Sequence, residues 1–426
     1  MKIENYKKRI ADDKIERYLK LFGAISIEGP KYCGKTWAGR YHSNSEILLH
    51  KTTGEQSNNV ELAKMSPSIV LEGEKPRLID EWQEATNLWD EIRIDVDKTG
   101  LKGQYIITGS STPNRDGIAH SGAGRYGKIH LRTMSLYESG DSTGNISLED
   151  LCNNKFKGKA TGEVDLRNLA MLIIRGGWPA NLKYSAKDAS EAIEEYINII
   201  INDDLYRLDG VNRDKHKVRL LLKSLARNES TTVSNMTLKK DINEKDHEDI
   251  DIDTLASYLN ALDKLFLLDN DEPFSTNVRS SVRVKQSEKR HFADPSIACS
   301  LLNIREENKL INDLETFGFL FEAMVERDLK VYADSFNAKC YHYQDYQGKE
   351  IDSVIELKNG EWCAFEIKLG ANQIEKAAND LLNLKKQIED EDGKVPSVLC
   401  VICGLTNAAY QRPDGVYVVP ITALKQ

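Results

Sequence analysis

The sequence lacks any apolar run that approaches the roughly 20 residues needed to cross a bilayer. Residues 1–20 are charged throughout and contain no apolar core of the kind found in signal peptides. The seven cysteines are odd in number and irregularly spaced, which argues against a disulfide framework. These absences predict a protein of the reducing cytoplasm that has no membrane association.

The sequence also has no excess of positive charge. It contains 58 Lys and Arg residues and 67 Asp and Glu residues, which gives a net charge of −9. The whole chain therefore exerts no global attraction on nucleic acid, although a local basic groove stays open. Hydrophobic residues make up 40% and charged residues 29%, an ordinary globular composition. With 426 residues and roughly 150 per domain, two to four domains are expected.

Short apolar runs alternate with loops and helical stretches between residues 24 and 135, after an amphipathic helix predicted over residues 4–22. This alternation predicts a parallel sheet with crossover helices, and so an α/β fold. The expected strands are Ala24–Ile27, Ile47–Leu49, Ile69–Leu71, Leu78–Ile79 and Tyr105–Thr108.

The first of these strands leads into a segment that fits GxxxxGK[ST] without deviation, and a helix-compatible stretch follows it. Glycines at both ends allow main-chain N–H groups to wrap a phosphate closely. Lys35 would reach the β- and γ-phosphates of ATP, and Thr36 would ligate Mg²⁺. The predicted nucleotide-binding residues are Gly29, Pro30, Lys31, Tyr32, Cys33, Gly34, Lys35, Thr36 and Trp37.

Two further strand ends carry polar residues that suit ATP hydrolysis. Asp80 ends an apolar strand and can hold Mg²⁺, while the adjacent Glu81 can polarise the attacking water. Ser110, after the next strand, would contact the γ-phosphate or that water. Arg125, in a Gly-rich loop over residues 116–127, would stabilise γ-phosphate charge in cis or from a neighbouring subunit, with a plain surface arginine as the alternative.

These motifs in this order resemble a bacterial and archaeal family of AAA-type ATPases whose ATPase domain is followed by a C-terminal conserved domain of unknown function. The resemblance rests on GPKYCGKT, LIDE, ITGSS and GAGRYGKIHLRTMSLYE, and it extends over nearly the whole chain. It implies an ASCE-type P-loop fold and the roles given above for Lys35, Thr36, Asp80 and Glu81. It leaves the biological process open.

The middle of the chain predicts three helices and a short wing strand, over His216–Ala226, Val233–Asp241, Asp253–Leu262 and Leu265–Asp269. This pattern resembles a winged-helix domain, which the family also carries. The third helix offers no Arg or Lys before Lys264, although a helix that reads DNA needs phosphate or base contacts. A protein-interaction or architectural role is therefore favoured over DNA reading.

The last third predicts a long helix followed by strands, with acidic residues and one lysine in the order E…D…ExK. Glu322 lies on the helix, Asp352 on one strand, and Glu366 and Lys368 at the end of the next. Residues i and i+2 of a strand face the same side, so Glu366 and Lys368 would point together. This spacing resembles the PD-(D/E)xK core of restriction-endonuclease-like folds, in which Asp352 and Glu366 would hold Mg²⁺.

Three domains follow from these patterns: a P-loop ATPase over residues 1–145, a helical and winged-helix-like region over 146–285, and a nuclease-like α/β domain over 286–426. The predicted function is Mg²⁺-dependent ATP hydrolysis coupled to a nuclease-like domain that acts on DNA or RNA. The alternative is an ATP-dependent switch that binds protein partners or assembles as a homo-oligomer, with an inactive nuclease-like domain.

Overall fold

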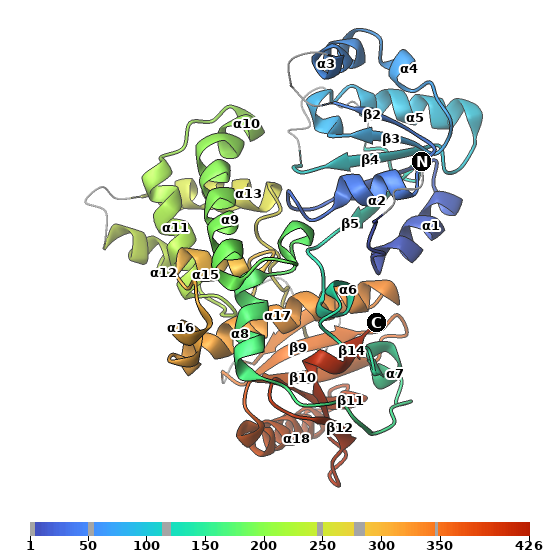
Figure 1. Ribbon diagram of the computed structural model, residues 1–426. Helices are drawn as coiled ribbons and strands as arrows, with labels where there is room; N and C mark the ends of the chain where they lie inside the picture. Colours follow the sequence, from blue (N-terminus) through green and yellow to red (C-terminus); the bar gives the residue numbers. More distant parts are fainter. Residues whose placement is uncertain (1–4, 50–54, 113–120, 245–249, 277–285, 346–347) are drawn as a thin grey trace. The chain divides into compact units, whose positions relative to one another are not determined.

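The computed structural model describes residues 5–49, 55–112, 121–244, 250–276, 286–345 and 348–426 (Figure 1). The chain divides into two compact units. The first contains Met1–Thr133, Asp203–Asn212 and Asn260–Leu267, and the second contains Met134–Asn202, Arg213–Leu259 and Leu268–Gln426. The first unit thus includes two short segments from the stretch that the sequence assigned to a middle domain.

A five-stranded sheet in the order β2-β3-β4-β1-β5 forms the centre of the first unit, and all its strand pairs are parallel (Figure 1). This confirms the α/β fold and the parallel sheet that the apolar runs predicted. The strands are β1 (Ala24–Glu28), β2 (Ser45–Leu48), β3 (Arg77–Asp80), β4 (Tyr105–Gly109) and β5 (Tyr126–His130).

Helices surround this sheet, and two of them differ from the sequence prediction. The amphipathic N-terminal helix begins at Ala11 rather than residue 4. The apolar run Ile69–Leu71 is not a strand, because Pro67 occupies the first turn of a short helix that extends to Val70. The helices of this unit are α1 (Ala11–Leu21), α2 (Lys35–Tyr41), α3 (Glu55–Met65), α4 (Pro67–Val70), α5 (Leu88–Thr99) and α10 (Leu205–Asp209).

Two apolar clusters hold the first unit together, one on each face of its sheet. Ile79 and Ile107 pack with Trp82 and Trp89 in one cluster, whereas Leu78 and Ile106 belong to the other. Neighbouring residues of a strand therefore face opposite clusters, as strand geometry requires. Because both faces are covered at β3 and β4, the centres of these two strands are continuously apolar rather than alternating.

The second unit begins with helices and ends with a larger sheet. Its helical part contains the three helices that the sequence predicted, but the predicted wing forms only isolated bridges such as Leu268 to Phe292. The helices are α6 (Leu136–Ser139), α7 (Leu148–Cys152), α8 (Leu166–Arg175), α9 (Ala186–Ile199), α11 (Lys215–Arg227), α12 (Asn235–Asn243), α13 (Ile252–Lys264, whose last turn is in the first unit), α15 (Pro295–Leu301), α16 (Glu307–Ile311), α17 (Leu314–Ser335) and α18 (Ile374–Asp390).

The larger sheet has seven strands in the order β7-β12-β13-β11-β10-β9-β8. The pairs β8–β9 and β9–β10 are antiparallel, while β10–β11 and β11–β13 are parallel. Its strands are β7 (Lys159–Ala160), β8 (Lys339–Gln344), β9 (Glu350–Glu356), β10 (Trp362–Lys368), β11 (Val398–Cys403), β12 (Ala408–Gln411) and β13 (Tyr417–Pro420); β6 (Ile146–Ser147) and β14 (Leu424–Lys425) form a separate pair.

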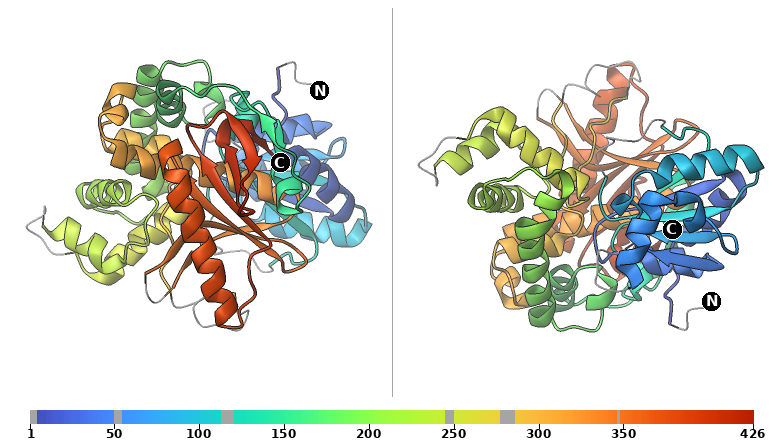
Figure 2. Two further views of the ribbon diagram at one scale, coloured as in Figure 1. Left: turned by 90° about the horizontal axis from the view of Figure 1, so that it is seen from below. Right: turned by 90° about the horizontal axis from the view of Figure 1, so that it is seen from above.

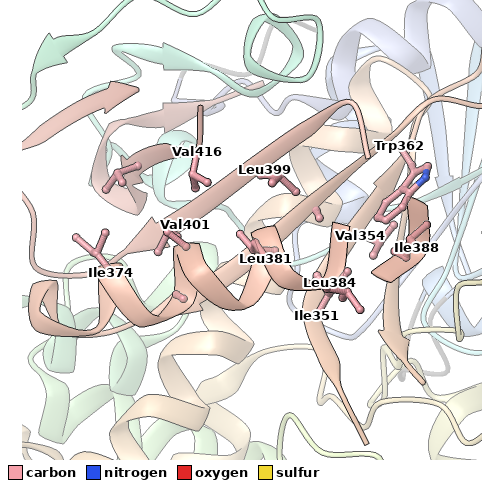
Figure 3. Packing of buried hydrophobic residues seen from close by; sticks show 14 of the residues in the cluster. Ile351, Val354, Trp362, Ile374, Leu381, Leu384, Ile388, Leu399, Val401 and Val416 are labelled. Carbon is pink, nitrogen blue, oxygen red and sulfur yellow. The ribbon is translucent and has the colours of Figure 1, made fainter. Parts of the chain in front are cut away.

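Helices α17 and α18 cover opposite faces of this sheet. Ser353 and Val354 are neighbours in β9, and Ser353 bonds to α17 whereas Val354 packs into the cluster under α18. Figure 3 shows Leu381, Leu384 and Ile388 of α18 facing that cluster. In the left view of Figure 2, α18 lies lengthwise over the strands. Ser353 and Glu326 are both buried, so the face of the sheet under α17 carries polar and charged groups.

Candidate nucleotide and carboxylate sites

The loop between β1 and α2 has the backbone shape that its two glycines predicted. Gly29 and Gly34 adopt φ values of 153° and 104°, which side chains other than hydrogen rarely allow. A Cβ on Gly29 would lie 2.2 Å from the carbonyl oxygen of Leu131. Tyr32 also has a positive φ of 65°, which is uncommon for an aromatic residue. The loop therefore holds a strained, closely approached backbone, as phosphate-binding loops do.

The side chain of Lys35 packs against its own loop and bonds to it. The ammonium group of Lys35 donates hydrogen bonds to the carbonyl oxygens of Gly29 at 2.9 Å and Pro30 at 2.7 Å. Lys35 is buried, with 5% of its surface exposed. The side chain thus lies over the loop that the sequence assigned to phosphate binding.

Asp80 contacts Thr36 of the phosphate loop, the residue with which the sequence predicted it to share a metal ion. Its buried carboxylate accepts hydrogen bonds from the Thr36 hydroxyl at 2.9 and 3.2 Å, and a further one from the Thr108 hydroxyl. A hydroxyl and a carboxylate are the oxygen ligands that Mg²⁺ prefers. The donor set therefore fits a magnesium ion, although no group of three or more His, Cys, Asp or Glu side chains is placed for a metal anywhere in the described ranges.

Glu81 is held beside this pair in a left-handed backbone conformation, with φ of 58°. Ser110 donates a hydrogen bond to its carboxylate at 3.0 Å, and the side-chain amide of Gln83 donates another. The predicted contact of Ser110 with the γ-phosphate or the water stays a prediction, and the sequence analysis assigned no role to Gln83. Its position two residues after Glu81 was the only available hint.

Arg125 is not brought to this site. It immediately precedes β5, whose first residue Tyr126 pairs with Ala24, at the opposite end of β1 from the phosphate loop. The length of β1 separates them by about 13 Å at ~3.3 Å per residue. Arg125 instead binds the carboxylate of Asp97 at 2.7 Å. This geometry is a correction to the predicted role in cis, and a role from a neighbouring subunit stays a prediction.

The side chains of three other predicted nucleotide-binding residues differ in how accessible they are to a ligand. Tyr32 and Trp37 are 69% and 48% exposed, so their rings are accessible. Cys33 is fully buried and its thiol contacts the carbonyl oxygen of Leu131 at 3.1 Å. Cys33 can therefore contribute only its main chain to a ligand.

Two charged residues that the sequence analysis missed support the loop. The guanidinium group of Arg9 donates to the carbonyl oxygens of Cys33 and Arg132, each at 2.9 Å. The ammonium group of Lys31 binds the buried carboxylate of Asp204 at 2.6 Å. Asp204 and Lys31 are 173 positions apart, and no local pattern marks Asp204 as a partner of the loop.

A second charged site lies in the larger sheet, where the structure brings Asp352, Glu366 and Lys368 together. The ammonium group of Lys368 lies 2.8 Å from the Asp352 carboxylate and 2.6 Å from that of Glu366. The main-chain N–H of Ile367 donates to Asp352 at 2.7 Å. Two carboxylates thus converge on one cationic group, the ammonium of Lys368.

Helix α17 adds two more acids to this site. Glu322 forms an ion pair with Lys289, a residue that the sequence analysis did not single out. Lys289 also donates to the main-chain oxygen of Asp352 at 3.2 Å. Glu326, one turn further along α17, accepts a hydrogen bond from Ser353 at 3.0 Å. Glu322, Asp352, Glu366 and Lys368 therefore belong to one connected network.

Burial sets the proton affinity of these acids. It raises the pKa of Glu322 to about 7 and that of Glu326 and Glu366 to about 8. Burial also acts to raise the pKa of Asp352, but the ammonium groups of Lys368 and Lys289 outweigh it and hold that pKa below its usual value. Asp352 is thus the member that stays ionised, while its neighbours titrate near neutral pH.

Comparisons with known proteins bear on the N-terminal region, which contains the phosphate loop. Residues 22–139 match the family model described as AAA domain. Residues 166–308 and 317–424 each match a model described as a domain of unknown function. The N-terminal region is therefore similar to AAA-type P-loop domains, which supports ATP binding. No helix in the described part of the chain is long and apolar enough to span a membrane.

Proteins that match most of the chain have low sequence identity to it. The uncharacterized proteins Rv2008c of Mycobacterium tuberculosis and Mb2031c of Mycobacterium bovis are each 24% identical over 85% of this chain and 74% of their own length. A Walker-type ATPase of Pyrococcus abyssi aligns with a TM-score of 0.44 at 14% identity, covering 71% of this chain and 97% of that one. RuvB of Thermotoga maritima gives 0.27 at 15% identity, covering 61% and 88%. At these TM-scores no function transfers from either structure.

Proposed function

We propose that this protein binds Mg²⁺-ATP at the loop after β1 and hydrolyses it to ADP and phosphate. The observation that carries the proposal is the 2.9 Å contact between the Thr36 hydroxyl and the Asp80 carboxylate, beside a Glu81 side chain held by Ser110. Thr36 and Asp80 would hold the metal, which would neutralise phosphate charge. Lys35 would leave the loop carbonyls and bind the β- and γ-phosphates.

Glu81 has the position and the chemistry of the general base. Its carboxylate would orient a water molecule and accept the proton that the water loses as it attacks the γ-phosphate. The hydrogen bonds from Ser110 and Gln83 occupy the same carboxylate oxygen. Those two side chains would therefore control when Glu81 is available.

The test is ATP binding and turnover by the full-length protein and two variants. Lys35→Ala should lose both, and Glu81→Gln should keep binding but lose turnover. Lys102→Ala removes an exposed lysine from the loop before β4 and should behave like the parent protein. Unchanged turnover in Lys35→Ala would refute the proposal.

A second function is proposed for the acidic site in the larger sheet: metal-dependent cleavage of DNA or RNA. The convergence of Asp352, Glu366 and Lys368 supports it, as does the order of α17, β8, β9, β10, α18 and β11, which suits the restriction-endonuclease-like fold predicted from the sequence. Asp352 and Glu366 would hold Mg²⁺, and Lys368 would stabilise the charge that develops on the phosphate. Cleavage requires Lys368 to release at least one carboxylate.

Incubation of DNA and RNA with Mg²⁺ or Mn²⁺ tests this second function. Asp352→Asn should abolish cleavage, whereas Lys358→Met, which changes an exposed lysine just after β9, should not. If the parent protein cuts neither polymer, the alternative gains: an ATP-dependent switch in which the C-terminal domain only binds. In that alternative the partner is a protein, or a second copy whose Arg125 reaches the ATP site.

Coupling between the two sites is the final part of the proposal. ATP turnover should be measured with and without DNA and RNA, in parallel on Lys35→Ala. Stimulation by one polymer would identify the substrate class, and stimulation by DNA would favour a DNA-acting role for the winged-helix-like region. All seven cysteines are free thiols, which supports a place in the reducing cytoplasm.

A further inference from the structure

Arg9 lies outside the predicted nucleotide-binding motifs, yet its side chain reaches the phosphate loop. Its guanidinium group donates to the carbonyl oxygen of Cys33 at 2.9 Å and, through its other terminal nitrogen, to those of Arg132 at 2.9 Å and Thr133 at 3.3 Å. Arg9 is 7% exposed, and its bond to Cys33 is buried. One side chain therefore connects the loop to the chain segment that follows β5.

This segment after β5 also contacts the loop directly. The carbonyl oxygen of Leu131 lies 3.1 Å from the Cys33 thiol and would lie 2.2 Å from a Cβ on Gly29. The loop therefore packs against residues 131–133. A carbonyl oxygen buried in such a contact needs a hydrogen-bond donor, and Arg9 supplies it to Cys33.

The bond from Arg9 determines the direction of one main-chain N–H group of the loop. Cys33 precedes Gly34, the residue just before α2, and the peptide bond between them is trans. In a trans peptide the C=O and the N–H point in opposite directions. Because Arg9 holds the Cys33 carbonyl on the side of residues 131–133, the N–H of Gly34 faces the opposite side.

The segment that carries Arg9 is itself fixed to α2. The carboxylate of Asp12 accepts hydrogen bonds from the N–H of Arg9 at 2.7 Å and from the hydroxyl of Tyr6 at 2.8 Å. It also lies 3.0 Å from Nε2 of His42, the residue after α2. The ring of Tyr6 stacks on that of Tyr41, in the last turn of α2, with centroids 4.5 Å apart. A guanidinium group presented from a fixed main chain loses little entropy when it holds the loop.

We propose that Arg9 is a positioning residue for nucleotide binding, which orients the N–H of Gly34 toward the β-phosphate before ATP or ADP arrives. This inference rests on the ATP site proposed above. Main-chain N–H groups of such loops bind the phosphates that ADP and ATP share. Arg9 does not contact the nucleotide, since its guanidinium group lies on the carbonyl side of the peptide that it orients.

Nucleotide binding and turnover by the full-length protein and two variants test the proposal. Arg9→Met removes the guanidinium donors, and Lys8→Met removes a charge from the exposed neighbouring residue as a matched control. Calorimetric titration with Mg²⁺-ADP should show that Arg9→Met raises Kd about tenfold and leaves the number of sites unchanged. In ATP hydrolysis the same variant should raise KM by a similar factor and keep kcat within about twofold, because this contact is made equally in the ground and transition states. Lys8→Met should match the parent protein.

A merely structural role for Arg9 would give a different result. Misfolded Arg9→Met molecules would lower the number of ADP sites and kcat, but would not change the Kd or KM of the folded ones. That result, or values equal to those of the parent, would overturn the inference and leave the ATP site standing. If the parent protein binds no ADP, the proposed function fails, and the inference fails with it.

Arg9→Lys decides the question if Arg9→Met does not fold. Its ammonium group keeps the charge but lacks the planar fork with which Arg9 bonds to Cys33 and Arg132 together. The Kd for ADP should therefore still rise about threefold, with the number of sites unchanged. A Kd equal to that of the parent protein would refute the inference.

Discussion

Thr36 and Asp80 are 44 positions apart in the sequence, yet the Thr36 hydroxyl donates a hydrogen bond to the Asp80 carboxylate at 2.9 Å. Thr36 follows β1 and Asp80 ends β3; β4 lies between these strands, and its Thr108 hydroxyl donates a hydrogen bond to the same carboxylate. The hydroxyl of Thr36 is therefore positioned before any ligand arrives. Preorganised groups of this kind lose little entropy when they bind.

Replacing Thr36 by Ala should lower ATP turnover about 100-fold, the usual cost of removing one preorganised polar contact from a reacting phosphate site. Thr36→Ser keeps the hydroxyl and should retain most of the activity. Turnover measured over a range of Mg²⁺ concentrations checks this. Equal loss in both variants would show that the methyl group, and not the oxygen, matters.

Ser110→Ala should reduce turnover by less than Glu81→Gln does. Glu81 would perform the proton transfer, whose loss typically costs about 10²- to 10⁴-fold. Ser110 only holds the Glu81 carboxylate at 3.0 Å, in company with Gln83. Single-turnover ATP hydrolysis on both variants makes the comparison, and an equal or larger loss for Ser110→Ala would mean that Ser110 itself contacts the phosphate or water.

Asp204→Asn should tighten ATP binding by about fivefold, because it removes a negative charge beside the phosphate loop. Lys31→Met should do the opposite and also lower thermal stability, since it leaves the Asp204 carboxylate buried without a cation. The double variant should recover the lost stability. Titration with a fluorescent ATP analogue and thermal unfolding provide both readouts; if the two single variants shift affinity in the same direction, the charge argument fails.

Arg125→Ala should change ATP turnover by less than about twofold in dilute protein, because side chains about 13 Å from a reacting group make no contact with it. Its ion pair with Asp97 is exposed and contributes little stability. Turnover should also be measured at increasing protein concentration. A defect that appears only at high concentration would support a role for Arg125 in a neighbouring subunit.

The acidic site predicts how stability depends on pH. The folded pKa of Glu326 is raised to about 8, from an ordinary value of 4.5. The folded state therefore binds this proton more tightly than the unfolded state, and the resulting stability is complete below pH 4.5 and lost as the pH rises through 8. Glu366, with a pKa of about 8, acts in the same direction.

Glu326→Gln should accordingly flatten the decline in stability between pH 5 and 8, because Gln has no proton to lose and can still accept the Ser353 hydrogen bond. Urea unfolding of parent and variant across this range checks the prediction. His291, with a pKa raised to about 9, contributes with the same sign in both proteins. Parallel curves for the two proteins would contradict the assignment.

Local patterns in the sequence were sufficient for much of the fold and for the centre of the first site. The phosphate loop, Asp80 and Glu81 follow from short motifs, because their geometry is set by glycines and by the ends of apolar strands. The strand prediction at Ile69–Leu71 was wrong because a Pro at a helix start outweighed three apolar residues. Short apolar runs do not distinguish strands from helices.

Other parts of the sites depend on contacts between distant segments, and no local pattern contains them. Arg9, Asp204 and Lys289 became visible only when the fold placed them beside the phosphate loop or the acidic site. Arg125 is the opposite case: the sequence suggested it for the ATP site, but it precedes β5 at the end of the sheet opposite the phosphate loop. Strand periodicity and pairing account for the proximity of Asp352, Glu366 and Lys368, whereas Glu322 on α17 joins them only through Lys289; the PD-(D/E)xK interpretation stays a prediction.

The division of the first unit into three stretches of chain has a consequence for biosynthesis. A polypeptide released after Thr133 would contain every predicted ATP-site residue, yet Lys31 would have no Asp204, and the N–H of Thr112 would lack the Lys264 carbonyl that it reaches at 2.9 Å. During translation the nucleotide-binding unit is complete only after Leu267 has left the ribosome. A nascent chain would thus acquire its full ATP site only after most of the helical region has been made.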